Sequence, residues 1–372
     1  MKRILKKTIQ IISISLFVTN SFASPIIGYG SSDSVLSAKN QELFIMGFEV
    51  GLQKVIKSKP LSELLVLDQV SNGSQLGAIG SAERLLAKGV SLLVGFPTSH
   101  EALLAAKVAK QKGVLAIFSG ASHSDLAKMG SSVFTTGESM DFAVESTLQF
   151  MRKKFNGKRG LLISNPYAVF STNQEDVFRE ILAKKENQDI PIKLTHLSKD
   201  LLLNEIDLMS VRNGEFDYIV VTPYADESAK LLEQLEKNRI DLPLITNSSW
   251  TTGDLDFGRR FLTTRKSPAY CATLWLKGSP DSREFERLIQ GRYGRPATAE
   301  IAYGYDLGVI AGRVLESIKG PITKESVMKE FVKHKCFEGL SSGKMCFTNS
   351  GGHAIRNFTF LRFSKNGFVV EK

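Results

Sequence analysis

The sequence is poor in the residues on which metal and nucleophilic chemistry depends. Its 372 residues include three cysteines and five histidines, and the histidines lie far apart along the chain. None of them belongs to a zinc-binding spacing, and neither a Gly-x-Ser-x-Gly elbow nor a phosphate-binding loop is present. These absences argue against an enzyme, so we predict no catalytic residue, no metal and no cofactor. A hydrolase is retained only as the alternative to a binding protein.

An apolar run long enough to span a membrane is also missing. The run from Ile9 to Val18 has about half of the roughly 20 residues that a bilayer-spanning helix needs. It follows a basic start at residues 2–7 and precedes the small residues Ser21 and Ala23, which is typical of a secretory signal peptide. An uncleaved membrane anchor is the alternative, which the short run disfavours. We expect cleavage after Ala23 and an exported, periplasmic protein with no membrane insertion after cleavage.

The basic excess lacks the aromatic partners of a nucleic-acid surface. The formal net charge is +10, from 48 Lys and Arg against 38 Asp and Glu. These residues are scattered, as with Lys107, Lys110 and Lys112 on one predicted helix, and no aromatic residues interleave with them. We interpret the charge as a solvated surface and predict no nucleic-acid partner.

The cysteines leave two arrangements open. In an oxidising compartment, a bridge between Cys336 and Cys346 would close the short segment between them and leave Cys271 as a buried free thiol. The alternative is that all three are reduced and merely packed, because sequence alone does not fix their pairing.

The chain has no Gly/Ser/Pro-rich tether and no repeats, and it alternates short apolar runs with longer amphipathic stretches. The apolar runs predict strands at 26–29, 64–68, 91–95, 114–118, 159–164, 190–197, 218–222 and 242–246. Short strands that alternate with helices indicate parallel sheets covered on both faces. The length is too great for a single core, so we predict a two-lobed α/β protein.

Several stretches carry a resemblance in a constant order. They are AERLLAKGV at 82–90, LVGFPTS at 93–99, FDYIVVTPY at 216–224, YGRPATA at 293–299 and AYGYD at 302–306. No single stretch is a sharp motif, but the similarity runs from residue 26 to the end of the chain. In this order they resemble the leucine/isoleucine/valine-binding protein family of periplasmic receptors, substrate-binding proteins of ABC transporters.

The resemblance implies a type I periplasmic-binding-protein fold, with two doubly wound parallel-sheet lobes joined by a three-stranded hinge. Residues 26–141 and 277–335 would form lobe one, and residues 142–276 and 336–372 would form lobe two. Ligands in this family lie in the cleft and lock the lobes shut by hinge closure. The resemblance also implies a monomer that meets the permease subunits of an ABC transporter.

The candidates on lobe one follow two predicted strands at one sheet edge, where open α/β sheets bind ligands. Thr98 and Ser99 begin a helix, where unpaired backbone N–H groups suit a carboxylate, and the resemblance gives Ser99 the position that holds the ligand carboxylate. Residues 98–101 also read as a capping box, which is the alternative role. The resemblance further implies that Ala121 offers a carbonyl and Ser122 a hydroxyl to an α-amino acid.

The candidates on lobe two depart from the family at two positions. Tyr224 matches an aromatic that reaches into the cleft, although a tyrosine packed on its own lobe is the alternative. Phe170 stands where the family has a tyrosine, which removes a phenol. Ser248 replaces the acidic residue that pairs with the ligand ammonium.

The loss at Ser248 leaves the recognition of an α-amino group open, because a buried ammonium needs a countercharge. Asp141, near the family's hinge-side acidic residue, is one candidate to supply it, and Glu138 and Asp226 are the others. We therefore expect a protein that captures an amino acid, another small carboxylate or an amide for an ABC transporter. A ligand-sensing or cell-envelope regulatory module without transport is the alternative.

Overall fold

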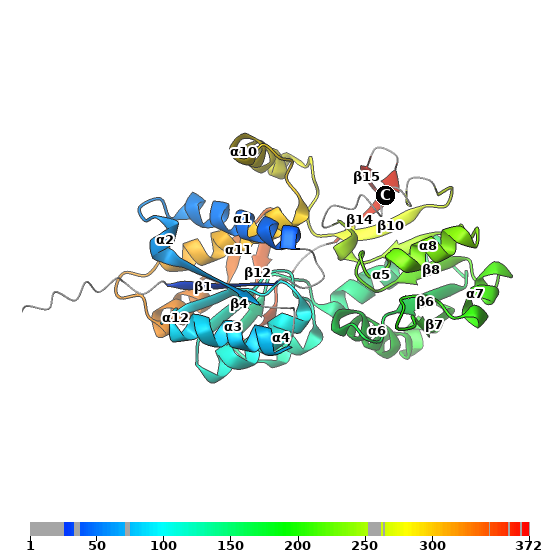
Figure 1. Ribbon diagram of the computed structural model, residues 1–372, viewed down its shortest axis with the longest axis horizontal. Helices are drawn as coiled ribbons and strands as arrows, with labels where there is room; N and C mark the ends of the chain where they lie inside the picture. The colour runs from blue at the N-terminus through cyan, green and yellow to red at the C-terminus, as the bar shows by residue number, and fades with distance from the viewer. Residues whose placement is uncertain are drawn as a thin grey trace, which may run out of the picture.

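Two sheet-centred lobes lie side by side in the computed structural model, the first on the left of Figure 1 and the second on the right. The structure describes residues 26–32, 38–70, 75–251, 262, 265–341, 343–355, 358–364 and 367–371. The expected signal peptide lies outside these residues. Within them, no helix combines the length and apolarity that crossing a membrane requires.

The first lobe is built on a six-stranded sheet in which all neighbours are parallel, in the order β13-β5-β4-β3-β1-β2. Its strands are β1 (Ile27–Ser32), β2 (Leu65–Val70), β3 (Leu92–Gly95), β4 (Leu115–Phe118), β5 (Val133–Thr135) and β13 (Gly352–His353). A parallel sheet is covered on both faces. In β3, accordingly, Leu92 and Val94 enter one core and Leu93 the other.

Helices cover both faces of this sheet. They are α1 (Ala38–Val55), α2 (Leu61–Leu64), α3 (Gln75–Ala87), α4 (Ser99–Gln111), α11 (Ala299–Glu316) and α12 (Lys324–His334). Helix α10 (Arg283–Tyr293) packs away from the sheet, against α11. Helices α3 and α4 pack on one face, and α1, α11 and α12 on the other. The first-lobe strands predicted from sequence all overlap observed ones, whereas β5, β13 and α12 had not been predicted.

Helices α1 and α11 meet backbone to backbone. A Cβ added to Gly47 would lie 2.0 Å from the Ile301 carbonyl oxygen, and one added to Gly304 would lie 2.0 Å from that of Phe44. Gly51 and Gly308 make the same close approaches one turn further along. Only glycine fits at such a distance, so the four glycines fix the axial position of α11 against α1.

The second lobe is built on a seven-stranded sheet in the order β15-β14-β10-β9-β8-β6-β7. Its parallel strands are β6 (Gly160–Ser164), β7 (Ile192–His196), β8 (Tyr218–Val221), β9 (Leu244–Thr246) and β10 (Ala269–Thr273). The strands β14 (Thr359–Ser364) and β15 (Gly367–Val370) extend it antiparallel. Its faces are covered by α5 (Met140–Phe155), α6 (Val169–Leu182), α7 (Glu205–Arg212) and α8 (Ala229–Lys237).

The chain passes between the lobes three times, after β5, after β10 and after β13. The last passage differs from the expected boundary, which assigned all of 336–372 to lobe two. Phe337 and Phe347 instead pack around Phe331 of α12, and β13 pairs with β5. These buried rings and this strand hold residues 336–354 on the first lobe, so that only β14 and β15 reach the second.

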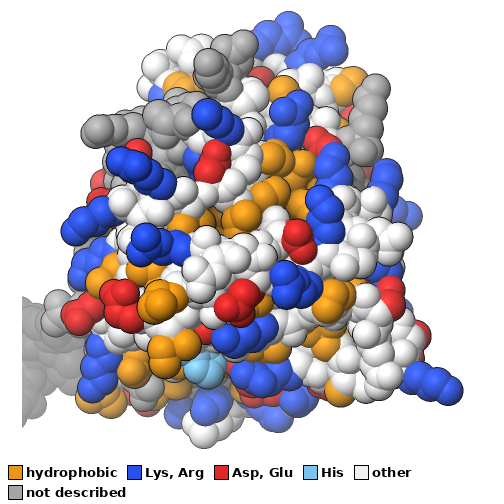
Figure 2. Space-filling view, turned by 90° about the vertical axis from the view of Figure 1, so that its right-hand side faces the viewer, with side chains coloured by type: hydrophobic (Ala, Val, Ile, Leu, Met, Phe, Trp, Pro, Cys, Tyr) orange, Lys and Arg blue, Asp and Glu red, His pale blue; other side chains and the backbone are white. Residues whose placement is uncertain are grey.

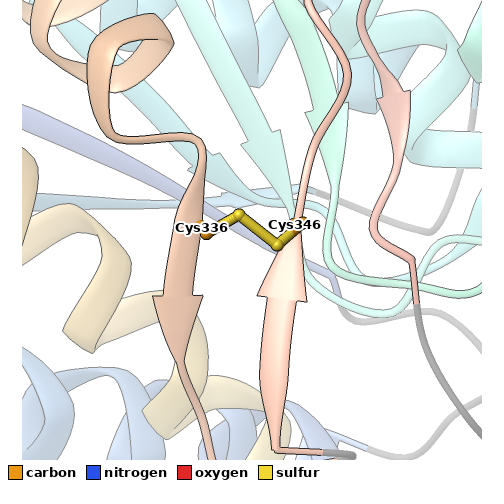
Figure 3. Close-up of a disulfide and its surroundings, with 2 residues drawn as sticks. All are labelled: Cys336 and Cys346. Atoms are coloured by element: carbon orange, nitrogen blue, oxygen red, sulfur yellow. A yellow bond between two sulfur atoms is a disulfide. The ribbon is translucent and has the colours of Figure 1, made fainter.

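A disulfide closes the hairpin of β11 (Cys336–Glu338) and β12 (Lys344–Cys346), as Figure 3 shows. Cys336 and Cys346 are directly paired across the two strands, with their Cα atoms 4.1 Å apart. Cys271 on β10 is buried and free. The bridged arrangement, one of the two left open by the sequence, is the one observed.

Charged side chains are dispersed over the outer end of the second lobe. Figure 2, which faces this end, shows lysine and arginine side chains interspersed with acidic ones around an apolar group. Several ion pairs in this lobe join different elements, among them Arg152 with Asp189 and Lys193 with Asp207.

Candidate functional site

A cavity lies between the lobes, where segments that follow the carboxyl ends of strands from both sheets converge. Its volume is about 60 Å³, which is enough for more than one water molecule. The first lobe contributes Phe44, Pro97, Gly120, Ser122, Glu300 and Tyr303 to its wall, and the second lobe contributes Phe170, Tyr224, Ser248 and Ser249. This is the sheet edge at which open α/β proteins bind ligands.

The loops after β3 and β4 are joined at the cavity. Thr98 caps α4 by accepting a hydrogen bond from the Glu101 backbone N–H, and its hydroxyl donates to the Glu101 carboxylate at 2.8 Å. Ser99, in the first turn, accepts at Oγ from the Ser122 backbone N–H at 3.3 Å. The capping role foreseen for Thr98 is therefore observed, with a carboxylate already placed at the start of the helix.

Tyr224 reaches across from the second lobe and hydrogen-bonds to the backbone of Ser99. Its ring stacks on Phe170 with centroids 4.6 Å apart and planes 15° from parallel. Burial, reinforced by nearby carboxylates of which Glu227 is the strongest, raises the pKa of the Tyr224 hydroxyl well above its usual range. The phenol is therefore a neutral hydrogen-bonding group at the junction of the lobes.

Two further contacts tie the second lobe to the rest of the molecule near the cavity. The Ser248 hydroxyl donates to Glu138 Oε1 at 3.1 Å, and Glu138 lies on the segment that crosses between β5 and α5. The Ser124 backbone N–H, in the first lobe, donates to Asn173 Oδ1 on α6 at 3.1 Å. These bonds hold the lobes together in this conformation.

The wall of the first lobe adds an acidic and aromatic group. Glu300 lies in the first turn of α11 with only 1% of its surface exposed. Phe44 on α1 and Tyr303 on α11 lie beside each other, with ring centroids 6.5 Å apart. The glycine contacts of α1 with α11 place these three side chains in the same wall.

The structure places some of the sequence-predicted site residues in the cavity wall and others in contacts within the first lobe. Four of them, Ser122, Phe170, Tyr224 and Ser248, line the cavity, and Ser99 is bonded to two of the four. Thr98 is engaged with Glu101, and the Ala121 carbonyl accepts from the Thr135 hydroxyl at 2.7 Å.

Asp141 differs from its expected place. It is exposed in the first turn of α5, whose start is capped by Ser139, and it is not among the residues that line the cavity. The turn that begins α5 turns Asp141 towards solvent. Glu138, three residues earlier, is the acidic group that contacts the cavity wall at Ser248.

Sequence reasoning missed Phe44, Glu300 and Tyr303. They follow no strand, and although Tyr303 lies in the stretch 302–306 that carries the resemblance, no pattern marks it as a site residue. The three meet because α1 and α11 pack closely. The usable signal was a pair of glycines four residues apart in each helix, at 47 and 51 and at 304 and 308. Among the described residues, no group of three His, Cys, Asp or Glu side chains is arranged to hold a metal ion.

Comparison with solved structures identifies the fold. A leucine-binding protein from Thermotoga maritima superposes with a TM-score of 0.79 at 17% identity, covering 94% of this chain and 98% of that one. A branched-chain amino-acid transporter substrate-binding protein from Streptococcus pneumoniae, solved with isoleucine, gives 0.75 at 18% identity, with 94% and 100% covered. An ABC-transporter solute-binding protein from R. palustris, solved with benzoate, gives 0.78 at 14%, with 93% and 95% covered. The fold is that of a type I periplasmic binding protein, as the sequence predicts.

Comparison of sequences gives a match at the level of the family. No curated protein matches the chain. The family model described as periplasmic binding protein matches residues 64–367, which is most of the sequence. The chain therefore belongs to the family of periplasmic binding proteins.

Proposed function

We propose that this protein is an exported solute-binding protein that captures a small polar molecule, such as an amino acid, another small carboxylate or an amide. The ligand enters the cavity between the lobes, which swing together about the three connecting segments. The observation that carries the proposal is the composition of the cavity wall, to which both lobes contribute polar and aromatic side chains. A ligand that contacts both walls favours the closed form by its differential affinity.

Binding is tested by calorimetry on the purified protein with amino acids, keto acids and amides. Ser122→Ala and Tyr224→Phe remove hydrogen-bonding groups from opposite walls, and each should weaken a bound ligand by about fivefold to tenfold, or roughly 1 to 1.4 kcal/mol. Tyr167→Phe, at an exposed tyrosine of the second lobe, is the matched control and should leave affinity unchanged. Unaltered affinity in both cavity variants would place the ligand elsewhere and contradict the proposal.

Delivery to an ABC transporter is supported by two of the similar structures: the R. palustris protein is an ABC-transporter solute-binding protein, and the S. pneumoniae protein is a transporter substrate-binding protein. Deleting the protein from its native cell should abolish uptake of the labelled ligand found by calorimetry, and the plasmid-borne wild type should restore it. Unchanged uptake in the deletion strain would contradict a transport role.

Export is supported by the basic, short-apolar and small-residue pattern of residues 1–23. Amino-terminal sequencing of protein recovered from the periplasmic fraction should begin at Ser24. A cytoplasmic protein that retains Met1 would contradict it.

A further inference from the structure

The cavity wall on the first lobe combines a carboxylate with two aromatic rings. Glu300 lines the cavity with Phe44 and Tyr303, and these rings lie 6.5 Å apart with planes inclined by 38°. On the opposite wall, Phe170 and Tyr224 form a second ring pair. Among the described residues that line the cavity, none is a lysine, an arginine or a histidine.

Aromatic faces and a carboxylate share one chemical preference. The face of an aromatic ring carries partial negative charge and attracts a cation placed over it. A carboxylate attracts a cation more strongly in a low-dielectric cavity than in water. Ring pairs on both sides and Glu300 in one wall therefore favour a positively charged group between the lobes.

The positions suited to an anion are already engaged by the protein. The Glu101 carboxylate lies at the start of α4 and accepts from Thr98, so it complements the positive end of that helix. The Ser122 backbone N–H donates to Ser99 Oγ. Burial, and to a smaller degree the carboxylates of which Glu227 is the strongest, raises the pKa of the Tyr224 hydroxyl, so the phenol stays neutral and offers no charge to an anion.

From this arrangement we infer that Glu300 is the countercharge for an ammonium group of the ligand, flanked by the rings of Phe44 and Tyr303. The inference rests on the proposed function and names its ligand class: a small ammonium compound with an apolar part that lies against Phe170 and Tyr224. The countercharge would then lie on α11 of the first lobe, and not on the second lobe, where Ser248 replaces the acidic residue that the resemblance implies. An amino acid and a free amine share this chemistry.

Matched sets of small molecules separate the charged groups. Each set holds an amino acid, its decarboxylated amine and its deaminated acid: leucine with isopentylamine and 4-methylpentanoate, and phenylalanine with phenethylamine and 3-phenylpropanoate. Calorimetry should show binding by an ammonium member of at least one set and none by the deaminated acids. Binding by the amino acid alone identifies an amino-acid ligand, and binding by the amine identifies a free amine; either supports the inference.

The inference and the proposed function fail in different ways. If neither ammonium member of any set binds, or if the deaminated acids bind as tightly, the inference is overturned. The proposed function survives that result if a deaminated acid, an amide or a keto acid binds and the cavity variants weaken it, and it fails if none of these compounds binds.

Glu300→Gln tests the countercharge directly. It should weaken the ammonium ligand by about tenfold or more, because it removes one partner of a buried charge pair. Glu316→Gln, at an exposed glutamate of the same helix, is the control and should change affinity by less than about twofold. Retention of wild-type affinity by a folded Glu300→Gln protein would overturn the inference.

Two further variants keep the test independent of folding at position 300. Phe44→Leu removes one flanking ring and should weaken trimethylated ammonium ligands more than neutral ones of the same shape. Adding Ser248→Glu to Glu300→Gln places a carboxylate on the opposite wall and should restore part of the lost affinity. Equal losses for charged and neutral ligands in Phe44→Leu, or no recovery in the double variant, would count against a charge role for this wall.

Discussion

The two lobes share an architecture but are stabilised by different means. The first lobe has an all-parallel sheet, a disulfide-closed hairpin and two helices in backbone contact. The second has a mixed sheet, and ion pairs such as Lys193 with Asp207 join elements that are separate in sequence. Among the described first-lobe residues, Arg84 of α3 pairs with Asp68 of β2, and the other pairs, such as Arg313 with Glu316, lie within a single helix. We therefore expect the first lobe to be sensitive to side-chain volume and the second to protonation.

The two tryptophans allow the comparison to be measured. Trp250 lies in a core of the second lobe, whereas Trp275 packs with Phe285 of α10 on the first. Fluorescence of Trp275→Phe protein therefore follows the second lobe, and that of Trp250→Phe protein follows the first.

The largest effect is expected from Gly308→Ala. The added Cβ would lie 2.1 Å from the Phe48 carbonyl oxygen, so α11 has to move away from α1. The free energy of unfolding of the first lobe in urea should fall by about 3 kcal/mol or more, because the atom in the way is backbone. Gly291→Ala on α10 meets nothing within 4 Å and should be neutral or stabilising by up to about 1 kcal/mol. Equal behaviour of the two variants would contradict the close contact.

Removing the disulfide should come next. Replacing both Cys336 and Cys346 with serine frees the loop in the unfolded chain and should destabilise the first lobe by about 2 to 3 kcal/mol. A reducing agent should have the same effect on the wild type and none on the double variant. If only the unfolding followed by Trp250 were destabilised, the disulfide would be stabilising the second lobe, which would contradict this prediction.

The pH dependence of the second lobe should be smaller and of defined sign. Bonds from Lys193, Thr195 and Asn204 outweigh burial and lower the pKa of the Asp207 carboxyl. The unfolded chain binds this proton more readily, so the contribution of Asp207 is present above the unfolded pKa and is lost as pH falls below about 4. In the Asp207→Asn protein, the free energy of unfolding followed by Trp250 should depend less on pH in this acid range. Exposed Asp200→Asn is the control and should leave this pH dependence unchanged.

The smallest effect should come from Arg313→Gln, which breaks an exposed pair within α11. Such pairs contribute about 0.3 kcal/mol. The difference should vanish in roughly 1 M salt, because exposed charges are screened. A salt-independent loss in thermal unfolding would show that the arginine stem acts by packing.

Residues near the strand ends were the predictable part of the site. The segments after β3, β4, β6, β8 and β9 all reach the cavity, because parallel strands bring their carboxyl ends to one edge. Strand runs such as 218–222 are recognisable because both faces are buried. Ser122 could therefore be placed at this edge from the strand pattern, whereas Tyr224 and Ser248 were named through the resemblance to the family.

Residues brought in by helix packing were not predictable in the same way. Glu300 and Phe44 lie far apart in the chain, and their meeting depends on how α11 slides along α1. The boundary at 336 failed for a similar reason, since Phe337 and Phe347 are placed by a ring cluster that no local pattern reveals. Asp141 was named for its place near the family's hinge-side acidic residue, and the sequence does not resolve which way a side chain points near a helix cap; the structure leaves it exposed.

The order in which the chain visits the two sheets sets the order in which they can be completed. The central strands β6 to β10 of the second lobe come from one continuous stretch, whereas the first lobe needs α11, α12 and β13 from the other side of that stretch. A chain emerging from a channel can therefore form the middle of the second sheet while the first still lacks half of its cover. Because distant contacts form slowly, the first lobe should be covered late, and its apolar strands are the surface that a chaperone would meet.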